Sequence, residues 1–77
     1  MPIGFVLIKA APKLEYKVYN TLSQVEQIIE LNPLFGEYDL IAKIEGDDFE
    51  KLGEITINII RKVKGVIDTK TLTGTRF

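Results

Sequence analysis

The order of strand-like and helix-like segments is the feature that most constrains the fold of this chain. Ile3–Ala10 is a continuous apolar run of strand length, and Asp39–Glu45 alternates between apolar and polar residues. A short β-prone stretch, Gln27–Leu31, lies between them, and Val66–Thr73 forms a last segment rich in β-branched residues. Two helix-like stretches complete the order β-α-β-β-α-β. This order predicts a ferredoxin-like α+β fold, a four-stranded antiparallel sheet with two helices on one face.

Each helix-like stretch carries one apolar stripe. The first stretch runs from about Pro12 to Ser23, and its stripe has a spacing of four residues: Leu14, Val18 and Leu22. The second runs from Asp47 to Lys64, where Asp47 and Glu50 match a capping box and Gly65 suits the residue after the helix. Its stripe is broad: Phe49, Leu52, Ile55, Ile59, Ile60 and Val63.

The connections predict the strand order and an uncovered sheet face. Right-handed crossovers place the first and third strands in the centre, so Pro33 falls on an edge strand, where a missing N–H is tolerated. Gly36-Glu37 is too short for a crossover and predicts a hairpin. Ile3–Ala10 is nevertheless typical of a strand buried on both faces, and Ile41 lies on the polar face of its strand. We therefore expect a second copy to cover the open face, giving a sheet-to-sheet dimer of the dimeric α+β barrel type.

Length and composition limit the function classes. Seventy-seven residues allow a single domain, spanning 1–77, and 45% of the residues are hydrophobic. The chain has no cysteine and no histidine, and its net charge of −1 argues against nucleic-acid binding on its own. No apolar run reaches the length of a membrane span, and the start of the chain lacks a signal-peptide pattern. We expect a cytoplasmic protein with no metal and no other cofactor.

Two glycine turns that each lead into a strand are the best candidates for a binding site. The first is followed by Tyr38 and the carboxylate of Asp39, and the second leads to the hydroxyls of Thr69 and Thr71. Turns expose backbone N–H groups. A carboxylate can hold an ammonium group, whereas N–H groups and hydroxyls can hold a carboxylate, so this inventory suits a small zwitterion.

These residues also carry a family resemblance. Gly36-Glu37-Tyr38-Asp39-Leu40, the helix ending Ile60-Arg61 before Gly65-Val66, and Thr69-Lys70-Thr71 are similar to the C-terminal effector-binding (RAM) domain of the leucine-responsive/asparagine-responsive (Lrp/AsnC) transcription regulators. The resemblance covers nearly the whole chain. Regulators of this family normally begin with a helix-turn-helix domain, to which nothing here corresponds, so the chain resembles the stand-alone members.

The resemblance implies a function and a set of partners. Members of the family dimerise through the sheet, commonly assemble into octamers, and bind free amino acids where dimers meet. Carried over by position, Gly36, Tyr38 and Asp39 form one wall of the site, and Thr69 and Thr71 form another, from the same or a neighbouring subunit. Asp39 pairs with the ligand ammonium, and the N–H groups of the turn hold its carboxylate. Longer Lrp/AsnC regulators are further possible partners.

Each of these residues has a simpler interpretation. Gly36 can serve only a turn with positive φ, Tyr38 can pack at a subunit contact, Asp39 can cap turn amides, and the two threonines can be ordinary strand residues. For the whole chain, the leading hypothesis is a non-enzymatic, amino-acid-binding regulatory module. A small dimeric enzyme of the monooxygenase type and a purely structural assembly unit are the alternatives. The enzyme hypothesis lacks a recognisable arrangement of acid and base.

Overall fold

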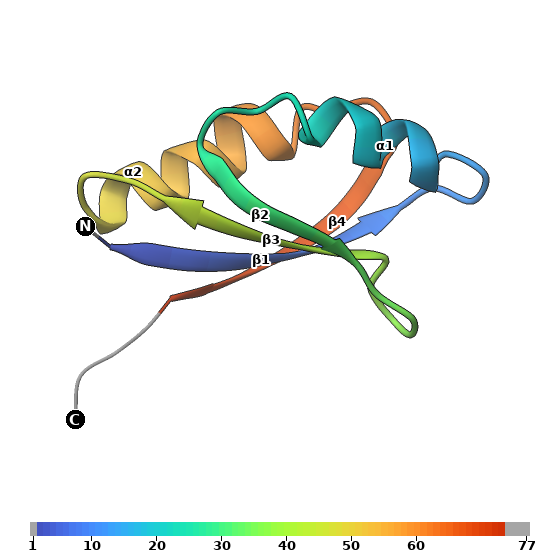
Figure 1. Ribbon diagram of the computed structural model, residues 1–77, viewed down its shortest axis with the longest axis horizontal. Helices are drawn as coiled ribbons and strands as arrows, with labels where there is room; N and C mark the ends of the chain where they lie inside the picture. The colour runs from blue at the N-terminus through green and yellow to red at the C-terminus, as the bar shows by residue number, and fades with distance from the viewer. Residues whose placement is uncertain (1, 74–77) are drawn as a thin grey trace.

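The computed structural model describes residues 2–73 and confirms the ferredoxin-like fold (Figure 1). The strands form one antiparallel sheet in the order β2-β3-β1-β4, so the first and third strands are central as predicted. Both helices lie on the same side of this sheet (Figure 1). The elements are β1 (Ile3–Ala10), α1 (Glu15–Leu22), β2 (Ile28–Pro33), β3 (Leu40–Glu45), α2 (Phe49–Ile55), a π-helical turn η1 (Thr56–Ile60) and β4 (Val66–Thr73).

The core lies between the helices and one face of the two central strands. Side chains alternate across a strand, so every second residue of β1 and β3 points toward the helices and is buried there. Ile59 and Val63 pack at the margin of this core. The buried apolar residues are Val6, Ile8, Ala10, Val18, Leu22, Leu40, Ala42, Ile44, Leu52, Ile55 and Ile60.

The opposite face of the sheet is open and largely apolar in its centre. Phe5 of β1 pairs with Leu72 of β4, and these side chains are 39% and 46% exposed. Leu7 pairs with Ile41 of β3, next along the same face. Within one chain β1 is therefore buried on the helix face alone, and burial of its other face by a second copy stays a prediction. The apolar run of β1 indicates that both faces of the strand are apolar, and one chain covers only one of these faces.

The first helix begins later than predicted. α1 starts at Glu15 rather than near Pro12, because Lys13 has a φ of +73°, which no helical residue adopts. Pro12 and Lys13 form a turn in which the Leu14 N–H donates to the Ala11 carbonyl at 2.9 Å. Val18 and Leu22 are buried as predicted, and Leu14 is half-buried.

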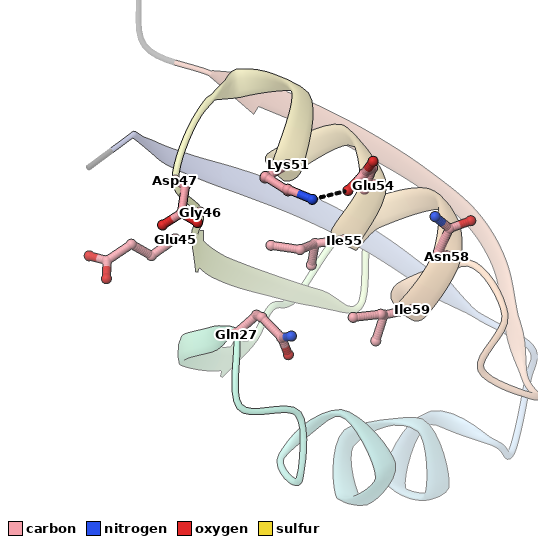
Figure 2. Close-up of a pocket in the computed structure, with 9 residues that line it drawn as sticks. All are labelled: Gln27, Glu45, Gly46, Asp47, Lys51, Glu54, Ile55, Asn58 and Ile59. Carbon is pink, nitrogen blue, oxygen red and sulfur yellow. Dashed lines mark ion pairs between the residues drawn. The ribbon is translucent and has the colours of Figure 1, made fainter.

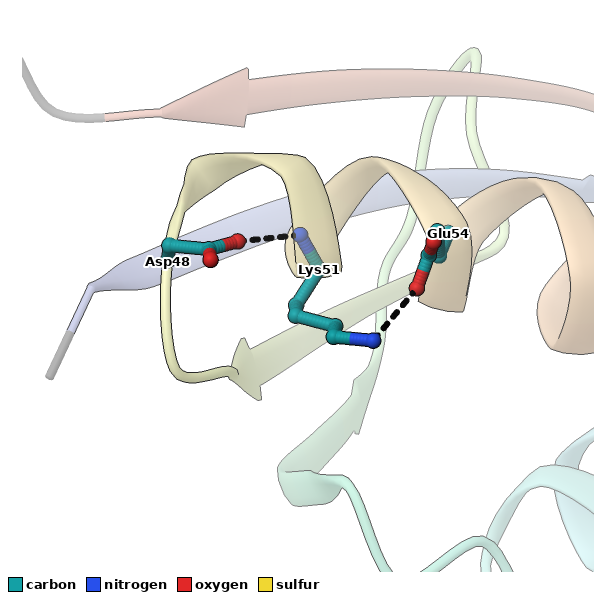
Figure 3. Close-up of polar contacts among 3 residues, drawn as sticks. All are labelled: Asp48, Lys51 and Glu54. Atoms are coloured by element: carbon teal, nitrogen blue, oxygen red, sulfur yellow. Dashed lines mark hydrogen bonds and ion pairs between the residues drawn. The ribbon is translucent and has the colours of Figure 1, made fainter.

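The second helix begins with a different N-cap residue than predicted and ends earlier than predicted. Asp48, not Asp47, is the N-cap: its side-chain oxygen accepts a hydrogen bond from the Lys51 N–H at 2.8 Å (Figure 3). The predicted capping box of Asp47 with Glu50 is therefore wrong. Phe49 becomes the first helical residue and is 59% exposed, so it does not belong to the buried stripe.

Near its end the second helix widens into a π-helical turn. The Arg61 N–H donates to the Thr56 carbonyl at 2.9 Å, five residues back, and the helix stops at Ile60 instead of Lys64. Gly65 does adopt a left-handed φ of +102°, but it lies beyond the helix end. A Cβ there would be 2.7 Å from Cγ2 of Val18, so the glycine is required for close packing.

Strand β2 is an edge strand whose regularity is interrupted twice. Pro33 is its last residue, as predicted for a residue that cannot donate to the sheet. The register with β3 shifts between Ile28 and Glu30, so the strand also contains a bulge. Among residues 2–73, no helix is long and apolar enough to cross a membrane.

The cap assignment can be tested by two neighbouring substitutions. Asp48→Ala should lower the free energy of unfolding by about 1 kcal/mol, because the Lys51 N–H loses its acceptor. Asp47→Ala makes the same change of charge one residue earlier and should stay within about 0.5 kcal/mol of the parent. Urea denaturation at one protein concentration measures both variants. A larger loss for Asp47→Ala would contradict the assignment.

Candidate functional site

The β2–β3 hairpin carries the glycine turn that the sequence singles out. The hairpin is closed by a hydrogen bond from the Leu34 N–H to the Asp39 carbonyl, at 2.8 Å. Gly36 lies at the exposed tip with a φ of +143°, a conformation that a residue with a side chain rarely adopts. The hairpin loop projects away from the body of the molecule (Figure 1). Its backbone is therefore accessible to a ligand or to a second chain.

Asp39 lies where this loop returns to the sheet, and it joins two strands. Its Oδ2 atom accepts a hydrogen bond from the Ala10 N–H at 2.8 Å, and its own N–H donates to the Ile8 carbonyl at 2.9 Å. Asp39 therefore binds a backbone amide of β1, whereas its simpler interpretation was a cap for amides of its own turn. The side chain is only half-buried. Tyr38 beside it is also half-buried.

A cavity of about 380 Å³ lies against Asp39. One wall comes from the end of β2 and the start of β3, and the other from the first turns of α1. The sequence did not predict a role for these residues of α1. Two tyrosines three positions apart on a short helix do not indicate a binding site until the position of the hairpin is known. The lining residues are Glu15, Tyr16, Tyr19, Pro33, Leu34, Asp39 and Leu40.

The two threonines lie elsewhere in the chain. Thr69 pairs with Ile8, which pairs with Leu40 on its other side, so β1 separates Thr69 from the start of β3 by about 10 Å. Thr71 lies further along β4, and its hydroxyl donates to the Thr56 hydroxyl at 3.3 Å. One chain therefore brings Tyr38 and Asp39 together and does not bring the threonines to them.

A second cavity, of about 410 Å³, lies between the β3–α2 turn and the helix (Figure 2). Within it, Lys51 and Glu54 form an ion pair at 3.1 Å (Figure 3). The Glu54 carboxylate raises the pKa of Lys51 through a hydrogen bond and through its charge. Lys51 is therefore a cation at neutral pH and not a general base. The cavity is lined by Gln27, Glu45, Gly46, Asp47, Lys51, Glu54, Ile55, Asn58 and Ile59.

Comparison with known proteins identifies the family. Residues 3–75 match the family model of the Lrp/AsnC ligand binding domain. An uncharacterized HTH-type transcriptional regulator of Pyrococcus furiosus is 30% identical over 72 residues, which are 90% of this chain and 48% of that regulator. The crystal structure of FFRP-DM1 is 31% identical with a TM-score of 0.90, covering 97% of this chain and 100% of the other.

Two further similarities are more distant or more partial. A transcriptional regulator from Neisseria meningitidis, solved as a complex with L-Met, has a TM-score of 0.84 at 13% identity, over 97% of this chain and 50% of that one, which shows a shared fold. The homocitrate synthase of Sulfurisphaera tokodaii is 39% identical over 64 residues, or 77% of this chain. That match covers 14% of the enzyme, so it does not make this chain catalytic.

The chain therefore belongs to the Lrp/AsnC family, through its ligand-binding domain. The homologous regulators support a regulatory role. The chain spans about half the length of the curated regulators that it matches.

The structural role of Asp39 can be separated from any role in binding. Asp39→Ala leaves the Ala10 N–H without its acceptor and should lower the free energy of unfolding by about 1 to 3 kcal/mol. Asp39→Asn keeps an acceptor oxygen at the same place, so its free energy of unfolding should fall by less than that of Asp39→Ala. Amide hydrogen exchange at Ala10 and urea denaturation measure the difference. Equal stability of the two variants would show that this hydrogen bond contributes nothing.

Proposed function

We propose that this protein is a non-enzymatic regulatory module that binds a free amino acid and self-associates through its sheet. The match of residues 3–75 to a ligand-binding domain of transcription regulators carries the proposal. The net charge of −1 does not favour DNA binding by this domain, so we infer that longer regulators of the same family are partners that supply the contact with DNA. The cytoplasm is the compartment that this role requires.

The open sheet face supports self-association. Its centre is apolar, with Phe5, Leu7, Ile41 and Leu72 in adjacent positions. Both signs of charge surround this centre, for example Lys43 and Glu45 on β3 and Asp68 and Lys70 on β4. A second copy related by a two-fold axis can cover the apolar residues and pair charges of opposite sign. Octamers built from such dimers are part of the proposal.

The amino acid is proposed to bind at the glycine turn of the hairpin. The carboxylate of Asp39 holds the ammonium group of the ligand, and N–H groups between Gly36 and Tyr38 hold the carboxylate of the ligand. The neighbouring cavity takes the side chain of the ligand. Thr69 and Thr71 can join this site only from another subunit, since β1 separates them from Asp39 within one chain. The L-Met complex of the Neisseria regulator supports this class of ligand.

Binding of the ligand is tested by thermal unfolding with each of the twenty amino acids. An amino acid that binds the folded protein stabilises it by about 2.7 kcal/mol at a concentration of a hundred times its dissociation constant. We expect a higher melting temperature with a subset of the panel and a change in oligomer size with the same subset. An unchanged melting temperature and unchanged assembly with all twenty would refute amino-acid binding and favour one of the two alternatives, the structural assembly unit or the small dimeric enzyme.

The proposed interface is tested by Phe5→Lys. The substitution places a charge in the centre of the open face, which should not disturb the fold of one chain but should prevent sheet-to-sheet packing. Light scattering after size-exclusion chromatography should then give the mass of a monomer. Phe49→Lys is the matched control, because Phe49 is exposed on the helix side, and it should keep the parent mass. A monomeric parent protein would refute the interface.

A further inference from the structure

The cavity beside Asp39 has an unusual balance of charge. Its lining residues include two carboxylates, Glu15 and Asp39, and no lysine or arginine. Lys13 and Lys17 flank Glu15 in the sequence but do not line the cavity. A ligand that entered it would therefore meet two negative charges without a compensating cation.

The remaining walls are aromatic and aliphatic. Tyr16 and Tyr19 come from the same helix as Glu15, and Pro33, Leu34 and Leu40 come from the hairpin side. Tyr16 is 76% exposed and Tyr19 is half-buried, so their rings are accessible. Phenol rings attract cations to their faces, and apolar walls pack against methylene groups. The volume of about 380 Å³ is in the range of small-molecule sites.

The two carboxylates come from opposite walls. Asp39 follows the hairpin loop at the start of β3, whereas Glu15 is the first residue of α1. An ordinary role for Glu15 is to interact with the N-terminal end of the helix dipole. That role does not require the tyrosines or the cavity. A ligand with an apolar side chain would displace water from Glu15 without offering it a partner, which is unfavourable for a charged group.

We propose that this cavity selects a basic α-amino acid, with its α-ammonium group on Asp39 and its side-chain cation between Glu15 and the tyrosine rings. The methylene groups of the ligand then lie against Tyr19, Pro33 and Leu34. This inference rests on the proposed function, because it names the class of amino acid that the same site takes. It goes beyond that function in assigning selectivity to Glu15, Tyr16 and Tyr19 of α1.

The test is calorimetric titration of the full chain with L-lysine and with L-norleucine, which has the same carbon chain and no side-chain ammonium. We expect lysine to bind about tenfold more tightly, the difference that one charge-assisted hydrogen bond typically makes. Glu15→Gln should remove this preference by weakening lysine about tenfold, and it should leave norleucine no weaker, because the neutral amide costs less to desolvate than the carboxylate. Glu50→Gln, the same change in the first turn of α2, is the matched control and should leave both affinities unchanged.

Two further variants complete the design. Asp39→Asn keeps an acceptor for the Ala10 N–H and should weaken both ligands, because both share the α-ammonium group. Tyr16→Leu keeps an apolar side chain at an exposed position and should weaken lysine about threefold without affecting norleucine. Circular dichroism verifies that each variant is folded.

The outcomes separate this inference from the proposed function. Equal or tighter binding of norleucine overturns the selectivity for a basic side chain and leaves amino-acid binding intact. A lysine preference that survives Glu15→Gln overturns the assignment to Glu15. Failure of all twenty amino acids to bind the parent protein removes the proposed function and this inference together.

Discussion

The one-sided cover of the sheet is the constraint on which the rest of this structure depends. Both helices pack on the face formed by Val6, Ile8, Ala42 and Ile44, and this packing provides the whole buried core. The second face of β1 is nearly as apolar, but the chain has no further element among its described residues to place there. A fold of this size gains little from a half-covered sheet. The pattern that forms the core therefore also leaves a second apolar face, on which the proposed association through the sheet rests.

The periodicity of the sequence predicted the elements and their order, because the alternation of a strand and the apolar stripe of a helix each extend over many residues. The ends of the helices depend on single residues and were harder to predict from the sequence. The late start of α1 follows from the left-handed Lys13, which no pattern marks. Asp47 and Asp48 are equally good caps by type, and only the backbone decides that Asp48 bonds to Lys51. The π-helical turn at Thr56–Ile60 leaves no signal in the apolar stripe.

The candidate site was predictable only in part. The hairpin residues Tyr38 and Asp39 are adjacent in sequence, so the turn chemistry pointed to them directly. The second carboxylate, Glu15, becomes relevant only when α1 packs beside the hairpin. Asp39 also illustrates why function and stability are difficult to separate by alanine substitution: its carboxylate bonds to the backbone of β1, and the same group is the proposed partner of the ligand.

The bulge and the terminal proline of β2 affect how copies of this protein can join. An uninterrupted outer strand invites another strand to extend the sheet sideways, and repeated addition leads to open-ended fibres. The register shift between Ile28 and Glu30 and the missing N–H of Pro33 interrupt that ladder at both ends of β2. Growth along this edge is therefore disfavoured. The proposed packing of two copies on the open face of the sheet would instead close on itself by two-fold symmetry.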